Sequence, residues 1–174
     1  AKDPKEKRAI IEEVAANKSP KLASLVARAK GELSKLDALG KPVDIKFTAI
    51  DGREVDLAQM KGKDVLIDYW ATWCGPCVRE IPNVVRSYDK FHSKGFEIIG
   101  ISLERDKDPK KLLAYVKEKK MPWPQYHDGL FWNNKLSKKY GIRSIPAMWL
   151  VDKKGNLVDM NARSGLEADR KSTR

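Results

Sequence analysis

The sequence predicts an α/β fold in which helices cover both faces of a central sheet. Segments with hydrophobic residues at helical spacing alternate with short apolar runs that are typical of strands. The run at 65–70 is apolar almost throughout, as in a strand buried on both faces. Strands that alternate with helices along a chain are typical of such layered folds. These observations together predict one α/β domain.

Residues 1–40 are predicted to form a helical extension, and residues 41–174 the α/β domain. Apolar residues at helical spacing indicate two helices in the extension, and Gly40 and Pro42 end the second. The domain begins with a β-hairpin, because period-two segments flank the turn signal Asp51-Gly52. The elements are expected in this order: strands 43–49 and 55–57, strand 65–70, helix 74–91, strand 96–102, helix 109–119, loop 121–129, helix 133–140 and strands 147–152 and 157–160. The polar segment 167–174 is interpreted as a helix start or a tail.

Composition favours an ordinary soluble protein over a disordered or membrane-embedded one. Of the 174 residues, 41% are hydrophobic and 34% are charged, and no apolar run approaches the roughly 18 residues of a membrane span. The formal charge of +11 comes from lysines scattered along the chain, without an arginine-rich arm or zinc-finger spacing. We therefore expect a basic, solvated surface, no nucleic-acid partner and a monomer.

The chain has two cysteines, Cys74 and Cys77, which follow a predicted buried strand and open a predicted helix. The thiolate is the reactive form of cysteine, and the N–H groups and partial positive charge at a helix N-terminus stabilise it. Cys74 at that terminus is therefore expected to have a lowered pKa, and Cys77, one turn further along, to be more shielded. This spacing predicts dithiol exchange, in which Cys74 attacks a partner disulfide and Cys77 resolves the mixed disulfide.

Two other uses of a Cys-x-x-Cys pair fit the sequence less well. A zinc site needs two further ligands, and the two histidines, His92 and His127, show no paired spacing. A structural disulfide that closes so short a loop would add little stability. We expect no metal and no cofactor.

The residues around the cysteines resemble a known family. The motif Trp73-Cys74-Gly75-Pro76-Cys77 resembles the thioredoxin active site, and 139–146 resembles the thioredoxin segment that ends in a cis-proline. Three further features are similar to TlpA-type (AhpC/TSA-like) thiol–disulfide oxidoreductases: the hairpin with Asp51-Gly52, Glu80-Ile81-Pro82, and Trp149-Leu150-Val151-Asp152 followed by Lys154-Gly155. The resemblance covers about 41–165. It implies a thioredoxin-like fold with a central mixed sheet.

The resemblance also implies which residues meet a partner. Pro146 would be the cis-proline that faces the disulfide, and Ile145 would offer backbone groups to an extended substrate, as in strand addition. Trp73, Gly75 and Pro76 would form the surface around the attacking cysteine. Trp132, in the loop before a short helix, is a further candidate for the substrate groove.

Two acidic residues are candidate proton acceptors for Cys77. Glu80 matches the acidic residue that the family keeps after the motif, and Asp68 matches the buried aspartate of thioredoxin. Either carboxylate, if desolvated, would have a raised pKa and would accept the proton. Glu80 is alternatively a solvent-facing helix residue. The sequence leaves open which of the two carboxylates is the acceptor.

The alternatives to dithiol exchange are a peroxiredoxin-like peroxide reductase and a non-catalytic thioredoxin-like binding module. A peroxiredoxin needs a Thr three residues before its reactive cysteine, and Ala71 is the residue three before Cys74. The Gly-Pro pair between the cysteines resembles a reductant. The resemblance therefore implies partner proteins with disulfides, an upstream reductase as electron donor, and an extracytoplasmic location, with the cytoplasm as the alternative.

Overall fold

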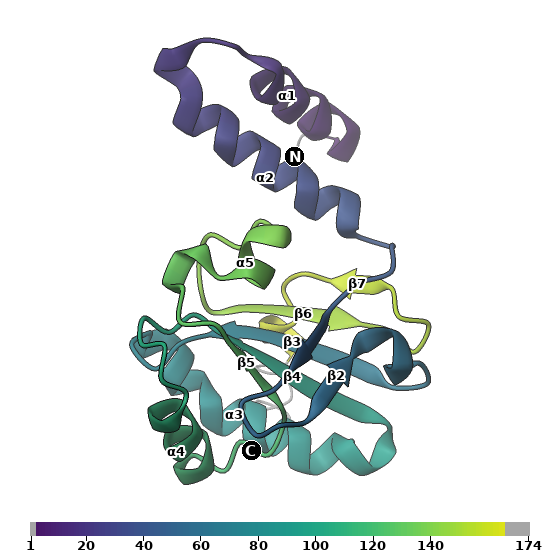
Figure 1. Ribbon diagram of the computed structural model, residues 1–174. Coiled ribbons are helices and arrows are strands. Elements are labelled where there is room, and N and C mark those ends of the chain that lie inside the picture. The colour runs from purple at the N-terminus through teal and green to yellow at the C-terminus, as the bar shows by residue number, and fades with distance from the viewer. Residues whose placement is uncertain (1–2, 166–174) are drawn as a thin grey trace.

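The computed structural model describes residues 3–165 and contains the predicted central sheet (Figure 1). Five strands form it: β3 (Asp64–Trp70), β4 (Phe96–Ser102), β5 (Gln125–His127), β6 (Ala147–Val151) and β7 (Leu157–Asp159). Their order across the sheet is β5-β4-β3-β6-β7. Strands β3, β4 and β5 run parallel, whereas β6 is antiparallel to β3 and β7 is antiparallel to β6. The predicted α/β fold with a mixed sheet is confirmed, and β3 lies at its centre.

Helices lie on both sides of this sheet. In Figure 1, α3 (Gly75–Phe91) and α4 (Lys110–Glu118) lie below it and α5 (Lys135–Lys139) lies above it. Short 3-10 helices occupy Pro20–Leu22, Leu57–Met60, His92–Lys94 and Phe131–Asn133. Side chains of β3 alternate between the two faces: the Trp70 ring lies 6.0 Å from that of Tyr115 on α4, and Tyr69 packs against a tryptophan of β6. Residues 65–70 are consequently all buried, as predicted.

The predicted β-hairpin ahead of the sheet is present, with a shorter first strand. It consists of β1 (Lys46–Thr48) and β2 (Glu54–Asp56), paired antiparallel. The prediction of a strand over 43–49 is corrected, because backbone groups before β1 bond elsewhere: the Val43 N–H donates to the Gly155 carbonyl at 3.2 Å. Val43 is nevertheless buried, as the alternation of apolar residues requires.

The segment 121–129 was predicted as a loop, and this prediction is wrong because the segment contains strand β5. This strand pairs with the edge of β4, where Gln125 lies opposite Gly100. Gly100 has no Cβ, and the Gln125 side chain occupies the space that a Cβ there would need. The three residues that follow Pro124 are too few to show an alternating pattern, so the pairing depends on this tertiary contact.

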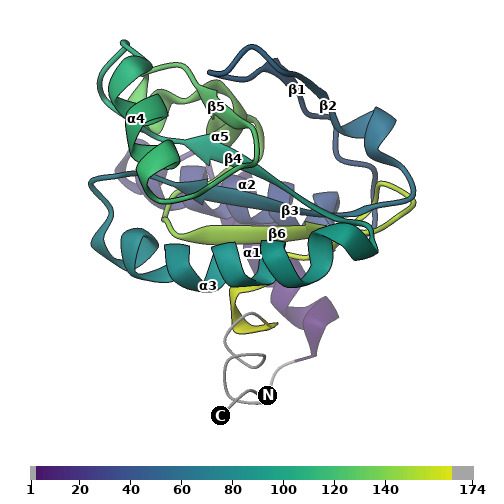
Figure 2. The ribbon, with the colours of Figure 1, turned by 90° about the horizontal axis from the view of Figure 1, so that it is seen from below.

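The N-terminal extension forms a helical hairpin of α1 (Pro4–Ala16) and α2 (Ala23–Ala38). Figure 2, seen from below, shows α3 in front of the sheet and α2 behind it. Arg8 and Asp37 join the two helices through an ion pair of 2.7 Å. Helix α2 contacts the domain through Arg143, whose Nη2 donates to the Ala27 carbonyl at 2.6 Å. The predicted helices of 1–40 are therefore present, and α2 contacts the domain.

Two sequence expectations concern the ends of the chain and the membrane. Among residues 3–165, no helix has both the length and the apolar character needed to cross a lipid bilayer. The polar segment predicted at 167–174 lies outside the described residues. The boundary between the extension and the domain at residue 40 stays a prediction.

Candidate redox site

The two cysteines lie where helix α3 begins, just after strand β3. Cys74 is the N-cap residue of α3, and its sulfur is bonded to that of Cys77, with the Cα atoms 5.2 Å apart. The Cys77 N–H lies 3.3 Å from Cys74 Sγ, so the amide end of the helix faces this sulfur. Both cysteines are buried, whereas Trp73, Gly75 and Pro76 around them are exposed. A partner approaching the disulfide would therefore meet these three residues first.

The loop ahead of Cys74 is held by the residues that follow strand β4. Thr72 donates twice to the Glu104 carboxylate, from its backbone N–H at 2.6 Å and from its hydroxyl at 3.0 Å. The Trp73 indole N–H donates to the Leu103 carbonyl at 2.9 Å. These contacts form because the carboxyl ends of the parallel strands β3 and β4 meet at one edge of the sheet. Sequence analysis missed Glu104, although an acidic residue just after the second buried strand was an available signal.

An aromatic wall, formed by Trp73, Phe131 and Trp132, lies beside the dithiol. The Trp73 ring centroid lies 5.1 Å from that of Phe131 and 6.0 Å from that of Trp132, both edge to face. The Arg105 guanidinium lies 4.2 Å from the Phe131 centroid, within cation–π distance. Trp73 is 40% exposed, so the wall presents apolar area to a partner. The sequence indicated Trp132 but neither Phe131 nor Arg105, whose positions depend on the fold.

Two carboxylates, Asp68 of β3 and Glu80 of α3, are buried, with 3% and 4% of each residue exposed. Glu80 is thus not the solvent-facing residue of the alternative prediction. Its Oε1 accepts a hydrogen bond from Asn83 Nδ2 at 2.7 Å and its Oε2 one from Arg163 Nε at 3.2 Å. Asp68 Oδ1 has no hydrogen-bond partner among the described residues. Burial, and then the charge of Glu80, raise the pKa of Asp68 to about 7.

The predicted cis-proline lies just before strand β6. The Ile145–Pro146 peptide bond is cis, as the resemblance implied. Pro146 and Arg163 line one cavity of about 290 Å³. Arg163 also donates to Glu80 of helix α3, one turn beyond the second cysteine. Sequence analysis did not indicate Arg163, which follows the last strand and reaches Glu80 only in the folded chain.

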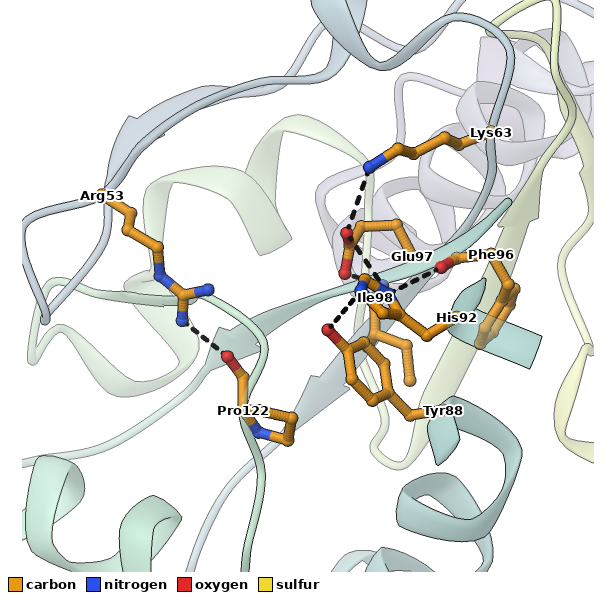
Figure 3. Close-up of polar contacts among 8 residues, drawn as sticks. All are labelled: Arg53, Lys63, Tyr88, His92, Phe96, Glu97, Ile98 and Pro122. Carbon is orange, nitrogen blue, oxygen red and sulfur yellow. Dashed lines mark hydrogen bonds and ion pairs between the residues drawn. The ribbon is translucent and has the colours of Figure 1, made fainter. Parts of the chain in front are cut away.

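The histidines lie away from any set of metal ligands in the described part of the chain. His92 is the C-cap residue of α3, at the opposite end of this helix from Cys74, and its Nδ1 lies 3.1 Å from the Phe96 carbonyl (Figure 3). Its Nε2 lies 3.5 Å from the Tyr88 hydroxyl, and its Nδ1 lies 3.7 Å from Glu97. Within residues 3–165, no group of three or more His, Cys, Asp or Glu side chains is placed to hold a metal ion.

The sequence has relatives among characterised proteins. Residues 39–160 match the AhpC/TSA family. The thiol-disulfide oxidoreductase ResA of Bacillus thuringiensis subsp. konkukian is 32% identical over 111 residues, which are 64% of this chain and 61% of that protein. ResA of Bacillus subtilis (strain 168) is 27% identical over 108 residues, 62% of this chain and 58% of that protein. The chain therefore spans about three fifths of the length of these relatives.

Solved structures share the architecture. The thioredoxin domain of a thiol-disulfide oxidoreductase from Bacteroides vulgatus superposes with a TM-score of 0.64 at 28% identity, over 78% of this chain and 96% of that one. A thiol:disulfide interchange protein from Bacteroides sp. gives the same TM-score and identity, over 78% of this chain and 89% of that one. With the family match extending over residues 39–160, the chain belongs to the AhpC/TSA family and has a thioredoxin-like fold.

Proposed function

We propose that the chain is a thiol–disulfide oxidoreductase that reduces disulfides in partner proteins. The observation that carries the proposal is the Cys74–Cys77 pair at the N-terminus of α3, flanked by exposed residues. In the reduced protein, the helix N-terminus would stabilise a thiolate at Cys74, the residue that faces the partner. The relatives described above bear the same activity in their names.

The exchange runs in two steps that move two electrons. The Cys74 thiolate attacks one sulfur of the partner disulfide, the partner's S–S bond breaks, and its second sulfur leaves as a thiolate that takes a proton from water. Cys77 then loses its proton and attacks Cys74 Sγ. The mixed disulfide breaks, and the partner sulfur that Cys74 had attacked leaves as a thiolate that takes up a proton. Cys74 and Cys77 have lost the two electrons that the partner gained.

We infer that Asp68, rather than Glu80, accepts the Cys77 proton. The Glu80 oxygens already accept hydrogen bonds from Asn83 and Arg163. Asp68 Oδ1 has no such donor, and the pKa of Asp68 near 7 lets it take up and release a proton at neutral pH. We therefore assign the proton transfer to Asp68, with Glu80 raising the pKa of Asp68 through its charge.

Five residues form the surface that meets the partner: Trp73, Gly75, Pro76, Ile145 and Pro146. The first three are exposed around Cys74, and Trp73 adds the apolar area of the aromatic wall. Ile145 offers backbone N–H and carbonyl groups to an extended segment of the partner. Pro146, directly before β6, lines the cavity that extends toward Arg163.

The direction of electron flow and the setting follow from the family resemblance. The Gly-Pro pair between the cysteines resembles a reductant, so the physiological direction is reduction of the partner. The Cys74–Cys77 disulfide that each turnover leaves must be reduced again by an upstream electron-donor reductase. The protein acts as a monomer on the extracytoplasmic side, with the cytoplasm as the alternative.

The alternative chemistries gain no support from the site. A peroxiredoxin would place a Thr hydroxyl at the position of Ala71, whose side chain has no polar group. A pure binding module would not need an intact dithiol over a buried carboxylate. A peroxide-consumption assay with the reduced protein distinguishes the first alternative, and alkylation of Cys74 at neutral pH distinguishes the second.

The proposal is tested by trapping the mixed disulfide. Reduced Cys77→Ser protein should accumulate a covalent adduct with a disulfide-containing protein such as insulin, because the resolving thiol is missing. Cys74→Ser protein is the matched control and should accumulate none. Adducts are counted by mass spectrometry after acid quenching. Equal trapping by the two variants, or none by either, would refute the assigned roles.

A further inference from the structure

A cleft beside the dithiol is formed by two adjoining cavities of about 440 Å³ and about 290 Å³. The two cavities share the lining residues Ile142 and Arg143, so they lie next to each other. We define the docking cleft by six lining residues: Trp132, Lys138, Ile142, Arg143, Pro146 and Arg163. Three features of the docking cleft indicate its ligand: its position near the dithiol, its positive charge, and its contact with helix α2.

The docking cleft passes the redox site. At one end, the Trp132 ring lies 6.0 Å from that of Trp73, the residue directly before the attacking cysteine. At the other end, Arg163 donates to Glu80, which lies one helical turn after the resolving cysteine. A polypeptide in the cleft would therefore lie close to residues that flank the disulfide.

The docking cleft carries positive charge that its own contacts do not cancel. Lys138 donates to a neutral side-chain amide oxygen at 3.2 Å, and Arg143 donates to a backbone carbonyl at 2.6 Å. Both side chains are exposed. Among the described residues that line either cavity, the acidic one is Glu32, and its carboxylate lies 3.6 Å from Lys35 Nζ. The charges of Lys138 and Arg143 thus remain available to a partner.

Two further cations lie near the disulfide. Arg105 lies over the aromatic wall, 5.7 Å from the Trp73 centroid. Arg79 lies beside the first turn of α3, where a Cβ on Gly75 would be 3.4 Å from its Nη1. Exposed cations such as these attract partners of the opposite charge and raise their association rate.

Helix α2 of the N-terminal extension supports the docking cleft from outside. The Arg143 guanidinium is held by the Ala27 carbonyl of this helix. Gly141, which has φ +64°, packs so closely on α2 that a Cβ there would lie 3.1 Å from the Gly31 carbonyl oxygen. The family match begins at residue 39, so this wall is an addition to the family's domain.

We propose that the docking cleft receives an acidic, extended segment of the partner protein that lies next to the partner's disulfide. This rests on the proposed function and adds the chemistry of the partner to it. An extended chain can occupy both of the neighbouring cavities at once. Its acidic side chains pair with Lys138 and Arg143, while the aromatic wall covers its apolar side chains.

The test compares three peptides with one disulfide each, which differ only in whether Asp, Ser or Lys residues flank the cystine. The second-order rate constant for oxidation of the reduced full chain is measured at about 50 mM and about 500 mM NaCl, because salt screens exposed charges. The expected order is Asp over Ser over Lys, with the differences shrinking at high salt. Lys138→Glu should lower the rate for the Asp peptide about fivefold and raise it for the Lys peptide.

The matched control is Lys154→Glu, which changes the net charge equally. Lys154 is exposed in the turn that joins β6 and β7, next to the amino end of β3 rather than its carboxyl end. This control should leave the peptide preference unchanged. Equal rates for the three peptides in the wild type, or equal effects of the two variants, would overturn the docking proposal. Failure of the wild type to react with any of the peptides would instead overturn the proposed function.

Discussion

Replacing the buried Asp68 by Asn should stabilise the protein, and the gain should grow with pH. Burial and the neighbouring Glu80 raise the pKa of Asp68 from 3.8 to about 7 in the folded state. Below about pH 4 the carboxyl is protonated in both the folded and the unfolded chain. As the pH rises from about 4 to about 7, the unfolded chain releases this proton first, so stability falls by about 1.36 kcal/mol per pH unit. The loss reaches about 4 kcal/mol by pH 8, and the uncharged Asn side chain avoids it.

The assay is urea unfolding of the oxidised protein at pH values between about 4 and 8, analysed by linear extrapolation. Asp68→Asn should be more stable than the wild type by about 4 kcal/mol at pH 8, and the advantage should fall toward zero at pH 4. Asp64→Asn, at the partly exposed start of the same strand, serves as the matched control and should show no such trend. A stability difference for Asp68→Asn that does not change with pH would refute the reasoning.

Two further predictions concern the contacts that hold the site. Glu104→Ala removes both acceptors of Thr72 and should lower the free energy of unfolding by about 1–3 kcal/mol. The control is Glu118→Ala, on the exposed face of α4, which should lower it far less in the same urea titration. Gly141→Ala should lower the free energy of unfolding for two reasons. Any L-residue at positive φ costs about 1–2 kcal/mol, and the added Cβ would also crowd the Gly31 carbonyl oxygen of α2. Gly155→Ala, also at positive φ but in open space, measures that backbone cost alone. If limited proteolysis released the N-terminal helices equally fast from both glycine variants, the proposed packing would be wrong.

Most of the fold was predictable because its long elements carry strong periodic patterns. Strand β3 is an uninterrupted buried run, and α3 has a wide apolar face over seventeen residues. Strand β5 was missed because it has three residues, and its pairing depends on Gly100 leaving room for the side chain of Gln125. Such a contact is between residues distant in the sequence, so no local pattern reports it.

The part of the candidate site that was predictable is the part in which the reactive residues are close together in the sequence. The spacing of Cys74 and Cys77 and their position before a helix were sufficient for the dithiol. Glu104 and Arg163 were not predicted, because each acts on a residue that is distant in the sequence. The proposed assignment of the proton transfer to Asp68 likewise uses the structure, because it depends on which carboxylate oxygens have hydrogen-bond donors.

The reduction potential of the Cys74–Cys77 couple tests the central proposal most directly. The protein is equilibrated with glutathione or dithiothreitol buffers of known potential, quenched with acid, and its free thiols are counted by alkylation and mass spectrometry. We predict a potential of about −250 mV or lower, near that of thioredoxin, as a disulfide reductase requires. A potential near about −120 mV, typical of strong disulfide donors, or a pair that does not equilibrate with these buffers, would contradict the proposal.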